Sequence, residues 1–163
     1  MKRLVSRASV LMASFLMVPS IVPHHGIPQS KYRSDKRLTR IQKFFRERGC
    51  PAEQLAEEFL LAADRHALDW RLLPSLSFVE SSGGKAYIGN NIMGWGSARS
   101  SFPSIRHGVQ LVASQLGTSS YYKDKDLLGK LKTYNPRPEY TQAVLRVMRS
   151  IGPARLGAGP DNR

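Results

Sequence analysis

The sequence predicts one mainly α-helical domain that contains a single long irregular region. Apolar residues recur at helical spacing through most of the chain between residues 38 and 151. Only Gly83 to Phe102 lacks this period, and that stretch is rich in Gly, Asn and Ser. The length of 163 residues is about one domain's worth, and 41% hydrophobic with 23% charged residues is typical of a globular protein. Long loops in compact domains are often functional, so we expect the irregular region to carry function.

The first predicted helix begins at Leu38 and stops at Gly49. Its apolar residues Ile41, Phe44 and Phe45 share one face with Leu38, and Lys and Arg occupy the opposite face. Such a helix can lie on a membrane surface or pack into a core with a solvated basic face. We favour the core helix, and the membrane-surface helix remains the alternative.

Two further helices are predicted before the irregular region. Pro51 opens one that extends to about His66, because Pro is favoured at the first helical position. Its apolar stripe contains Leu55, Phe59 and Ala63. Asp69 is the predicted N-cap of the next helix, which runs to Ser81. The apolar residues of that helix are Leu72, Leu73, Leu76 and Val79.

Three more helices are predicted after the irregular region. Ser104 caps the first of them, which ends at Gly117. A short helix follows from Asp124 to Leu131, and the last extends from Pro138 to Ile151. We therefore expect residues 38–153 to form the domain and residues 154–163, which are rich in Gly and Pro, to form a flexible tail.

The N-terminus resembles an export signal. Lys2, Arg3 and Arg7 precede an uncharged, largely apolar run from Ala8 to Pro23, which is shorter than a membrane-spanning helix requires. We expect residues 1–26 to be a signal peptide or an uncleaved N-terminal anchor, followed by a linker over residues 27–37. The predicted location is periplasmic or extracellular, with membrane attachment if the segment is retained.

The composition limits the function classes. One cysteine cannot form an intramolecular disulfide, and the four histidines show no zinc-binding spacing, so we expect no metal and no cofactor. The net charge of +13 favours polyanionic partners. Export removes most nucleic acid from reach, so an anionic cell wall or membrane surface is the expected basic-surface partner. We expect a monomer that does not bind nucleic acid.

Glu80 is the strongest candidate for chemistry. On a helix it falls on the apolar stripe, four residues after Leu76, and the Ser-Ser-Gly-Gly that follows lets a loop open beside it. A carboxyl at the edge of an apolar pocket has a raised pKa and can act as a general acid near neutral pH. The alternative is a structural Glu that reaches solvent or pairs with a lysine such as Lys85.

Three segments resemble the lysozyme-like superfamily. HALDWRLLPSLSFVESSGGK (66–85) is similar to the catalytic helix of lysozyme-like muramidases and lytic transglycosylases, which ends in Glu-Ser. NNIMGWGS (90–97) resembles an element of bacterial endo-β-N-acetylglucosaminidase-like domains, and YNPRPEY (134–140) resembles the Tyr-Asn element of the same superfamily. The resemblance covers residues 38–151 and implies a lysozyme-like helical domain in which the Gly/Asn/Ser-rich loop forms one wall of the cleft.

The resemblance also implies roles for individual residues. Glu80 would be the catalytic acid, and Tyr134 would steady it or its substrate through the phenol hydroxyl. Asn90 and Asn91 would shape a saccharide cleft, although Asn is also common in turns. The full set of expected substrate-binding residues is Ser81, Asn90, Asn91, Trp95 and Asn135. Trp95 suits stacking on a sugar face, or alternatively anchors the loop to the core.

The sequence offers one carboxylate where common glycosidases use two. No Asp or Glu lies between Glu80 and Asp124, and the other candidates fit helix N-termini. Those candidates are Asp69, Asp124, Asp126 and Glu139. The resemblance implies that the substrate supplies the second group, either a sugar 6-hydroxyl that gives a 1,6-anhydro product or an N-acetyl group that leads to hydrolysis.

The expected function is cleavage of peptidoglycan or a related amino-sugar glycan, by an endo-β-N-acetylglucosaminidase-like or lytic transglycosylase activity. Two alternatives from other classes remain. One is a non-catalytic wall- or glycan-binding module on the same fold, in which Glu80 is structural. The other is a basic polyanion-binding protein, whose binding would weaken steeply with salt.

Overall fold

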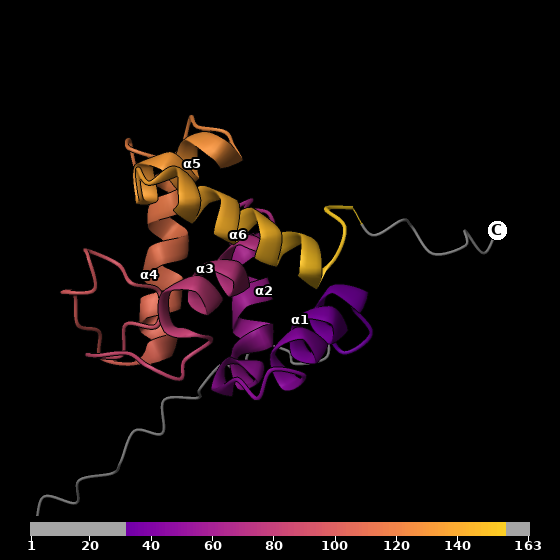
Figure 1. Ribbon diagram of the computed structural model, residues 1–163. Coiled ribbons are helices and arrows are strands. Elements are labelled where there is room, and N and C mark those ends of the chain that lie inside the picture. Colours follow the sequence, from indigo (N-terminus) through magenta and orange to yellow (C-terminus); the bar gives the residue numbers. More distant parts are fainter. Residues whose placement is uncertain (1–31, 156–163) are drawn as a thin grey trace, which may run out of the picture.

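The computed structural model describes residues 32–155, and over this range the chain is mainly α-helical with no strand, as the sequence predicts (Figure 1). A short 3-10 helix of five residues, η2, precedes the second α-helix. The elements in chain order are α1 (Lys36–Arg46), η2 (Pro51–Leu55), α2 (Ala56–Arg65), α3 (Leu72–Ser81), α4 (Ile105–Thr118), α5 (Leu127–Tyr134) and α6 (Pro138–Ile151).

The helical body extends slightly beyond the predicted domain at its N-terminal side. Tyr32 is buried and donates a hydrogen bond from its hydroxyl to Asp64, so residues 32–37, which the sequence assigns to a linker, pack with the helices. The predicted signal or anchor (1–26) and residues 156–163 of the predicted tail lie outside the described residues. Within residues 32–155, no helix has both the length and the apolar character needed to cross a bilayer.

Helix α1 is a core helix. The carboxylate of Asp35 caps it by accepting a 2.8 Å hydrogen bond from the backbone N–H of Arg37. Ile41, Phe44 and Phe45 are almost fully buried, whereas the basic side chains lie on the outer side of the helix. The structure therefore supports the core interpretation of this basic amphipathic helix.

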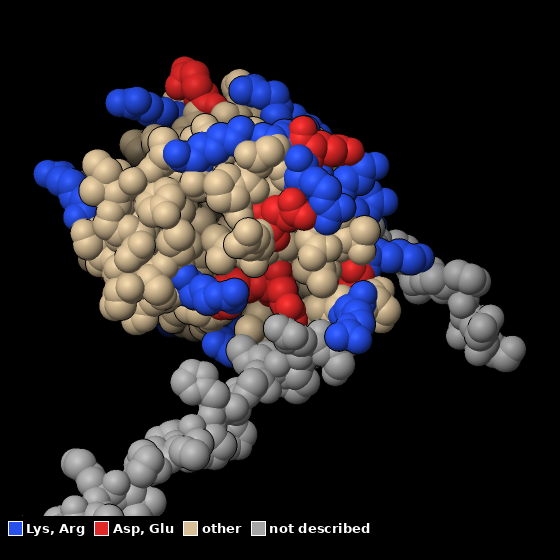
Figure 2. Space-filling model, turned by 90° about the horizontal axis from the view of Figure 1, so that it is seen from below, with Lys and Arg blue, Asp and Glu red and all other residues tan. Residues whose placement is uncertain are grey.

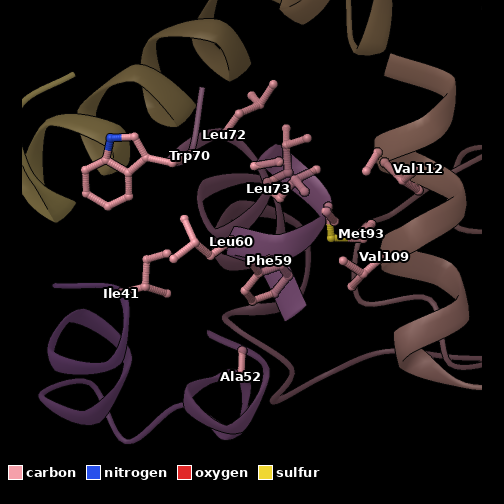
Figure 3. Close-up of a cluster of buried hydrophobic side chains, with 14 of the residues drawn as sticks. Ile41, Ala52, Phe59, Leu60, Trp70, Leu72, Leu73, Met93, Val109 and Val112 are labelled. Atoms are coloured by element: carbon pink, nitrogen blue, oxygen red, sulfur yellow. The ribbon is translucent and has the colours of Figure 1, made fainter. Parts of the chain in front are cut away.

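Helix α3 lies in the middle of the molecule and packs against α2 and α6 (Figure 1). Its apolar residues meet those of α1, α2 and α4 in one core, in which Met93 from the irregular region also takes part (Figure 3). The core residues labelled in that view are Ile41, Ala52, Phe59, Leu60, Trp70, Leu72, Leu73, Met93, Val109 and Val112. Burial of an apolar side chain contributes roughly 1.5–3 kcal/mol, so this core fixes the helix from which Glu80 projects.

Several helix boundaries differ from the predicted ones. The expected helix from Pro51 to His66 is interrupted, because Leu55 has φ −101° and ψ 3°, and the chain forms η2 before α2 begins. Asp69 does not cap α3 directly. Its carboxylate accepts from the backbone N–H and the guanidinium of Arg71, and α3 begins only at Leu72.

Three boundaries in the C-terminal half also move. Helix α4 continues through Gly117 to Thr118, and the glycine lies against His66 with an ordinary helical backbone. Helix α5 begins three residues later than predicted, because Asp126 is its N-cap and accepts a 2.7 Å hydrogen bond from the N–H of Gly129. It ends at Tyr134 rather than at Leu131. Ser104 and the bounds of α6 are as predicted.

The end of α3 is held against the start of η2 by a close backbone approach. Ser82 adopts a left-handed conformation with φ 52°, and Gly83 follows with φ +65°. A Cβ at Gly83 would lie 2.9 Å from the Cβ of Cys50, so no larger residue fits there. The carbonyl of Gly83 also accepts a 3.0 Å hydrogen bond from the N–H of Ala52. These contacts fix where the last turn of α3, including Glu80, ends.

Candidate functional site

A cleft of about 790 Å³ opens beside the last turn of α3. One side is formed by the irregular region around residues 94–98, and the other by the chain that joins α5 to α6. This volume is in the range of small-molecule and saccharide sites. The lining residues are Glu80, Gly94, Trp95, Gly96, Ser97, Ala98, Tyr122, Tyr134, Asn135, Pro136 and Arg137.

Glu80 is the acidic residue of this lining, and its carboxyl is partly removed from water. Burial raises its pKa above the ordinary value for Glu, and an interaction with the hydroxyl of Tyr140 partly offsets the rise. The pKa direction matches the sequence expectation of a carboxyl at the edge of an apolar pocket. A group of this kind stays protonated to higher pH than a solvated Glu, which suits a proton donor.

Gly94 packs directly on the carboxyl of Glu80. A Cβ at this position would overlap Oε2 and would lie 2.9 Å from Cγ, and the backbone has φ +66°. The missing side chain therefore allows the irregular region to approach Glu80 more closely than any other residue would. Gly94 therefore covers one side of the Glu80 carboxyl and keeps water from that side.

Aromatic rings form much of the remaining wall. Tyr134 and Tyr140 are stacked with ring centroids 6.1 Å apart and an angle of 9° between ring planes. Trp95 meets Tyr134 edge to face at 5.6 Å and lies 6.1 Å from the ring of Tyr122. The rings bring little charge near Glu80, and such surfaces are the kind on which sugar rings stack.

The hydroxyl of Tyr134 is hydrogen-bonded to the irregular region rather than to Glu80. This hydroxyl donates a hydrogen bond to the carbonyl oxygen of Met93, the residue before Gly94. Burial raises the pKa of Tyr134 well above its usual value, and the nearby Glu80 carboxylate raises it further, so the phenol stays protonated. Tyr134 thus lies in the cleft lining, and its hydroxyl is hydrogen-bonded to the loop that covers the carboxyl rather than to Glu80.

The buried side chain of Asn91 holds the irregular region together through hydrogen bonds to its backbone. Its side chain is 4% exposed, its amide N–H groups donate to the carbonyls of Trp95 and Ser100 at 2.9 Å, and its Oδ1 accepts from the N–H of Trp95 at 3.0 Å. Asn90 has φ 59° and donates to the carbonyl of Phe102. Both Asn side chains shape the loop that forms the cleft wall, and neither belongs to the cleft lining.

Replacing Asn91 by alanine should loosen this loop. The change would leave buried backbone groups of Trp95 and Ser100 without partners, which costs about 1–3 kcal/mol. We expect a lower free energy of unfolding in denaturant titrations and faster amide exchange in residues 91–100. Asn90→Gly removes a single such bond, and glycine suits the left-handed backbone of this residue (φ 59°), so this change should have the smaller effect. Equal effects of the two changes would contradict this account of the loop.

Of the other expected substrate-binding residues, some line the cleft and one only supports the surrounding backbone. Ser81 is 3% exposed and is used internally, since its hydroxyl donates to the carbonyl of Ser77 and accepts from the N–H of Gly84. Trp95 and Asn135 line the cleft. The Oδ1 of Asn135 also accepts a 3.1 Å hydrogen bond from the N–H of Arg137, which shapes the turn before α6. Trp95 both lines the cleft and packs on the core, so its two interpretations are compatible.

The other carboxylates lie away from the cleft lining. Asp69 is paired with Arg71, with 2.6 Å between Oδ2 and Nη2, and Asp126 caps α5. Asp124 and Glu139 are exposed. Within residues 32–155, no group of three or more His, Cys, Asp or Glu is placed to hold a metal ion.

Basic residues are distributed widely over the surface. On the face seen in Figure 2, Lys and Arg are spread around the molecule with Asp and Glu between several of them, and a broad area carries no charge. Arg137, at the end of the cleft, is exposed and is the basic residue of the lining. The charge on the viewed face is therefore dispersed rather than gathered in one stripe.

Sequence reasoning did not single out Gly94, Tyr122 or Tyr140 as site residues. Tyr140 lies in the first turn of α6, and Tyr122 lies in the connection between α4 and α5. The residue spacing does not place Tyr140 beside Tyr134, because α5 ends at Tyr134 and α6 begins at Pro138. Comparisons with protein-family models, with curated proteins and with solved structures find no match to the chain.

Proposed function

We propose that the chain is an exported enzyme that cleaves the glycan strands of peptidoglycan, on a lysozyme-like helical domain, with Glu80 as general acid and then general base. The observation that carries the proposal is a carboxyl of raised pKa at the side of an open, aromatic-walled cleft. The N-terminal export pattern and the high net positive charge of +13 favour an anionic cell-wall polymer as the partner.

In the first step, the protonated Glu80 gives its proton to the oxygen of the scissile glycosidic bond. The bond between that oxygen and the anomeric carbon breaks, the leaving sugar departs with a new hydroxyl, and Glu80 becomes a carboxylate. The reacting sugar develops positive charge at the anomeric carbon. Trp95 and Tyr122 present ring surfaces against which the sugar can be held.

In the second step, Glu80 takes a proton back from the group that attacks the anomeric carbon. If that group is the sugar's own 6-hydroxyl, the product is a 1,6-anhydro sugar. If the substrate's N-acetyl oxygen attacks first, it gives an oxazolinium ion and Glu80 stays a carboxylate. Water then attacks the anomeric carbon, gives its proton to Glu80 and opens the ring, so the product has a reducing end. The cleft lining contains Glu80 as its acidic residue, which favours these substrate-assisted routes over a mechanism with two protein carboxylates.

A direct test uses purified sacculi. Incubation with the purified protein should lower turbidity and release muropeptides, and mass spectrometry should identify anhydro or reducing ends. Anhydro ends would assign the transglycosylase route, and reducing ends would assign hydrolysis. Retention on sacculi with no released saccharide would instead identify a non-catalytic binding module, and salt-sensitive binding to any polyanion without release would identify a general polyanion-binding protein.

The single-carboxylate scheme predicts that the remaining candidate carboxylates are dispensable. Asp69→Asn, Asp124→Asn, Asp126→Asn and Glu139→Gln should each leave turnover within a few fold of wild type, because none lines the cleft. Asp126→Asn should lower the free energy of unfolding by roughly 0.5–1 kcal/mol, since a helix cap loses its charge. A loss of turnover as large as that of Glu80→Gln in any of the four would show that a second protein carboxylate takes part.

A further inference from the structure

The phenol of Tyr140 is a buried polar group without a conventional partner. Its hydroxyl oxygen is inaccessible to solvent and makes no hydrogen bond of standard geometry with another described residue. Burial raises the pKa of Tyr140 most, and the charges of Tyr134 and Glu80 raise it further, so the carboxyl of Glu80 lies near the phenol. A buried hydroxyl of this kind is costly to keep unless its contact has a use.

The ring of Tyr140 is held in place by its neighbours. It lies in the first turn of α6 and stacks nearly parallel on Tyr134. The hydroxyl of Tyr134 is already committed to the carbonyl of Met93 and does not compete for the carboxyl. The two tyrosines therefore have separate tasks, although they form one stacked pair.

Glu80 is consequently confined from two sides. Gly94 lies against the carboxyl, with no room for a side chain between them, and Tyr134 fixes the adjacent Met93. Tyr140 lies near the carboxyl on α6, the helix that packs most extensively on α3. The side of the carboxyl that faces the cleft is open to a substrate.

We propose that Tyr140 is the positioning residue of Glu80, donating its phenolic proton toward one carboxyl oxygen so that the other oxygen faces the glycosidic bond. The inference rests on the proposed function, because it assigns to Tyr140 the steadying role that the family resemblance gave to Tyr134. Tyr140 keeps its proton throughout. When Glu80 gives up its own proton, the phenol hydrogen bond to the new carboxylate strengthens, and it weakens again when Glu80 is reprotonated.

Tyr140 and Glu80 make no hydrogen bond of standard geometry in this structure, and this geometry does not exclude one during turnover. Catalytic hydrogen bonds are often long or bent before substrate binds and tighten in the complex. Because the phenol stabilises the charged form of Glu80, its removal should raise the pKa of that carboxyl.

The decisive variant is Tyr140→Phe, which keeps the stacked ring and removes the hydroxyl. The matched control is Tyr121→Phe, whose side chain is 74% exposed. The first measurement is a carbon-13 NMR titration of the Glu80 carboxyl, assigned by its disappearance in Glu80→Gln. We expect the pKa of Glu80 to rise in Tyr140→Phe and to remain unchanged in Tyr121→Phe.

The second measurement is the pH profile of glycan cleavage. In Tyr140→Phe, kcat/KM should fall about tenfold, and its alkaline limb should move to higher pH by the same amount as the NMR pKa. Thermal unfolding should show that both variants are folded. Should Tyr140→Phe fail to fold, replacement of Tyr140 by a ring-fluorinated tyrosine, a stronger donor of the same shape, should lower the pKa of Glu80.

The possible results separate the inference from the proposed function. An unchanged Glu80 pKa in a folded Tyr140→Phe protein overturns the inference, whatever the activity. A raised pKa together with no cleavage by wild-type protein establishes the contact and overturns the proposed enzyme. A raised pKa, reduced cleavage and a shifted alkaline limb support both.

Discussion

Replacement of Glu80 by glutamine should reduce glycan cleavage by about 10² to 10⁴, the range in which a general acid contributes. The amide has the shape of the protonated carboxyl but no proton to transfer to the glycosidic oxygen. Binding of the glycan should be nearly unchanged, since the aromatic wall of the cleft is intact. The measurement is the rate of muropeptide release at saturating sacculi, compared with retention of the variant on the same sacculi. Activity within about tenfold of wild type would exclude Glu80 as the acid.

The same variant should be more stable than wild type at neutral and alkaline pH. Burial raises the pKa of Glu80 in the folded protein above its value in the unfolded chain. The contribution of Glu80 to stability is therefore complete below the pKa that it has in the unfolded chain, and it is lost as pH rises through the pKa that it has in the folded protein. Glutamine does not titrate and avoids this loss. The difference in melting temperature between the two proteins should therefore increase from acid to alkaline pH, whereas a solvated Glu80 would give a difference independent of pH.

Gly94→Ala should be nearly as damaging as Glu80→Gln, with cleavage reduced by at least about a hundredfold. The new Cβ would overlap Oε2 of Glu80, so either the carboxyl or the loop must move. A displacement of about 1 Å at a reacting group can cost 10² in rate. Alanine at this left-handed backbone position adds strain of roughly 1–2 kcal/mol, so stability should fall as well.

Gly49→Ala is the matched control for Gly94→Ala. Gly49 is also left-handed, with φ +57°, but a Cβ there would meet no atom within 4 Å. It carries the same backbone strain with no effect on the carboxyl, so it should lose stability and keep its cleavage rate. Measuring unfolding and cleavage for both variants separates strain from the overlap with Glu80. Equal loss of cleavage in both would show that the contact of Gly94 with Glu80 is unimportant.

The helical part of the fold was predictable because its causes are local. Ile41, Phe44 and Phe45 recur at helical spacing and are buried together, and Ser104 caps α4 as a short polar residue before an apolar stripe should. The start of α3 differs from the prediction and depends in part on a contact outside the local sequence. The carboxylate of Asp69 accepts a hydrogen bond from the guanidinium of Arg71. The same guanidinium donates to the carbonyl of Gly152, so the start of α3 is linked to the end of α6.

For the candidate site, the sequence by itself determined the position of Glu80, because a carboxylate on an apolar helical stripe is visible in the residue order. The tertiary structure decided what surrounds that carboxyl. Gly94, Tyr134 and Tyr140 meet Glu80 from the irregular region and two later helices, and residue spacing carries no information on how such segments pack. The positioning hydroxyl that we propose for Glu80 belongs to Tyr140 rather than Tyr134, because the hydroxyl of Tyr134 is hydrogen-bonded to Met93. That hydrogen bond and the stacking of the two rings form only when α5, α6 and the loop are packed together.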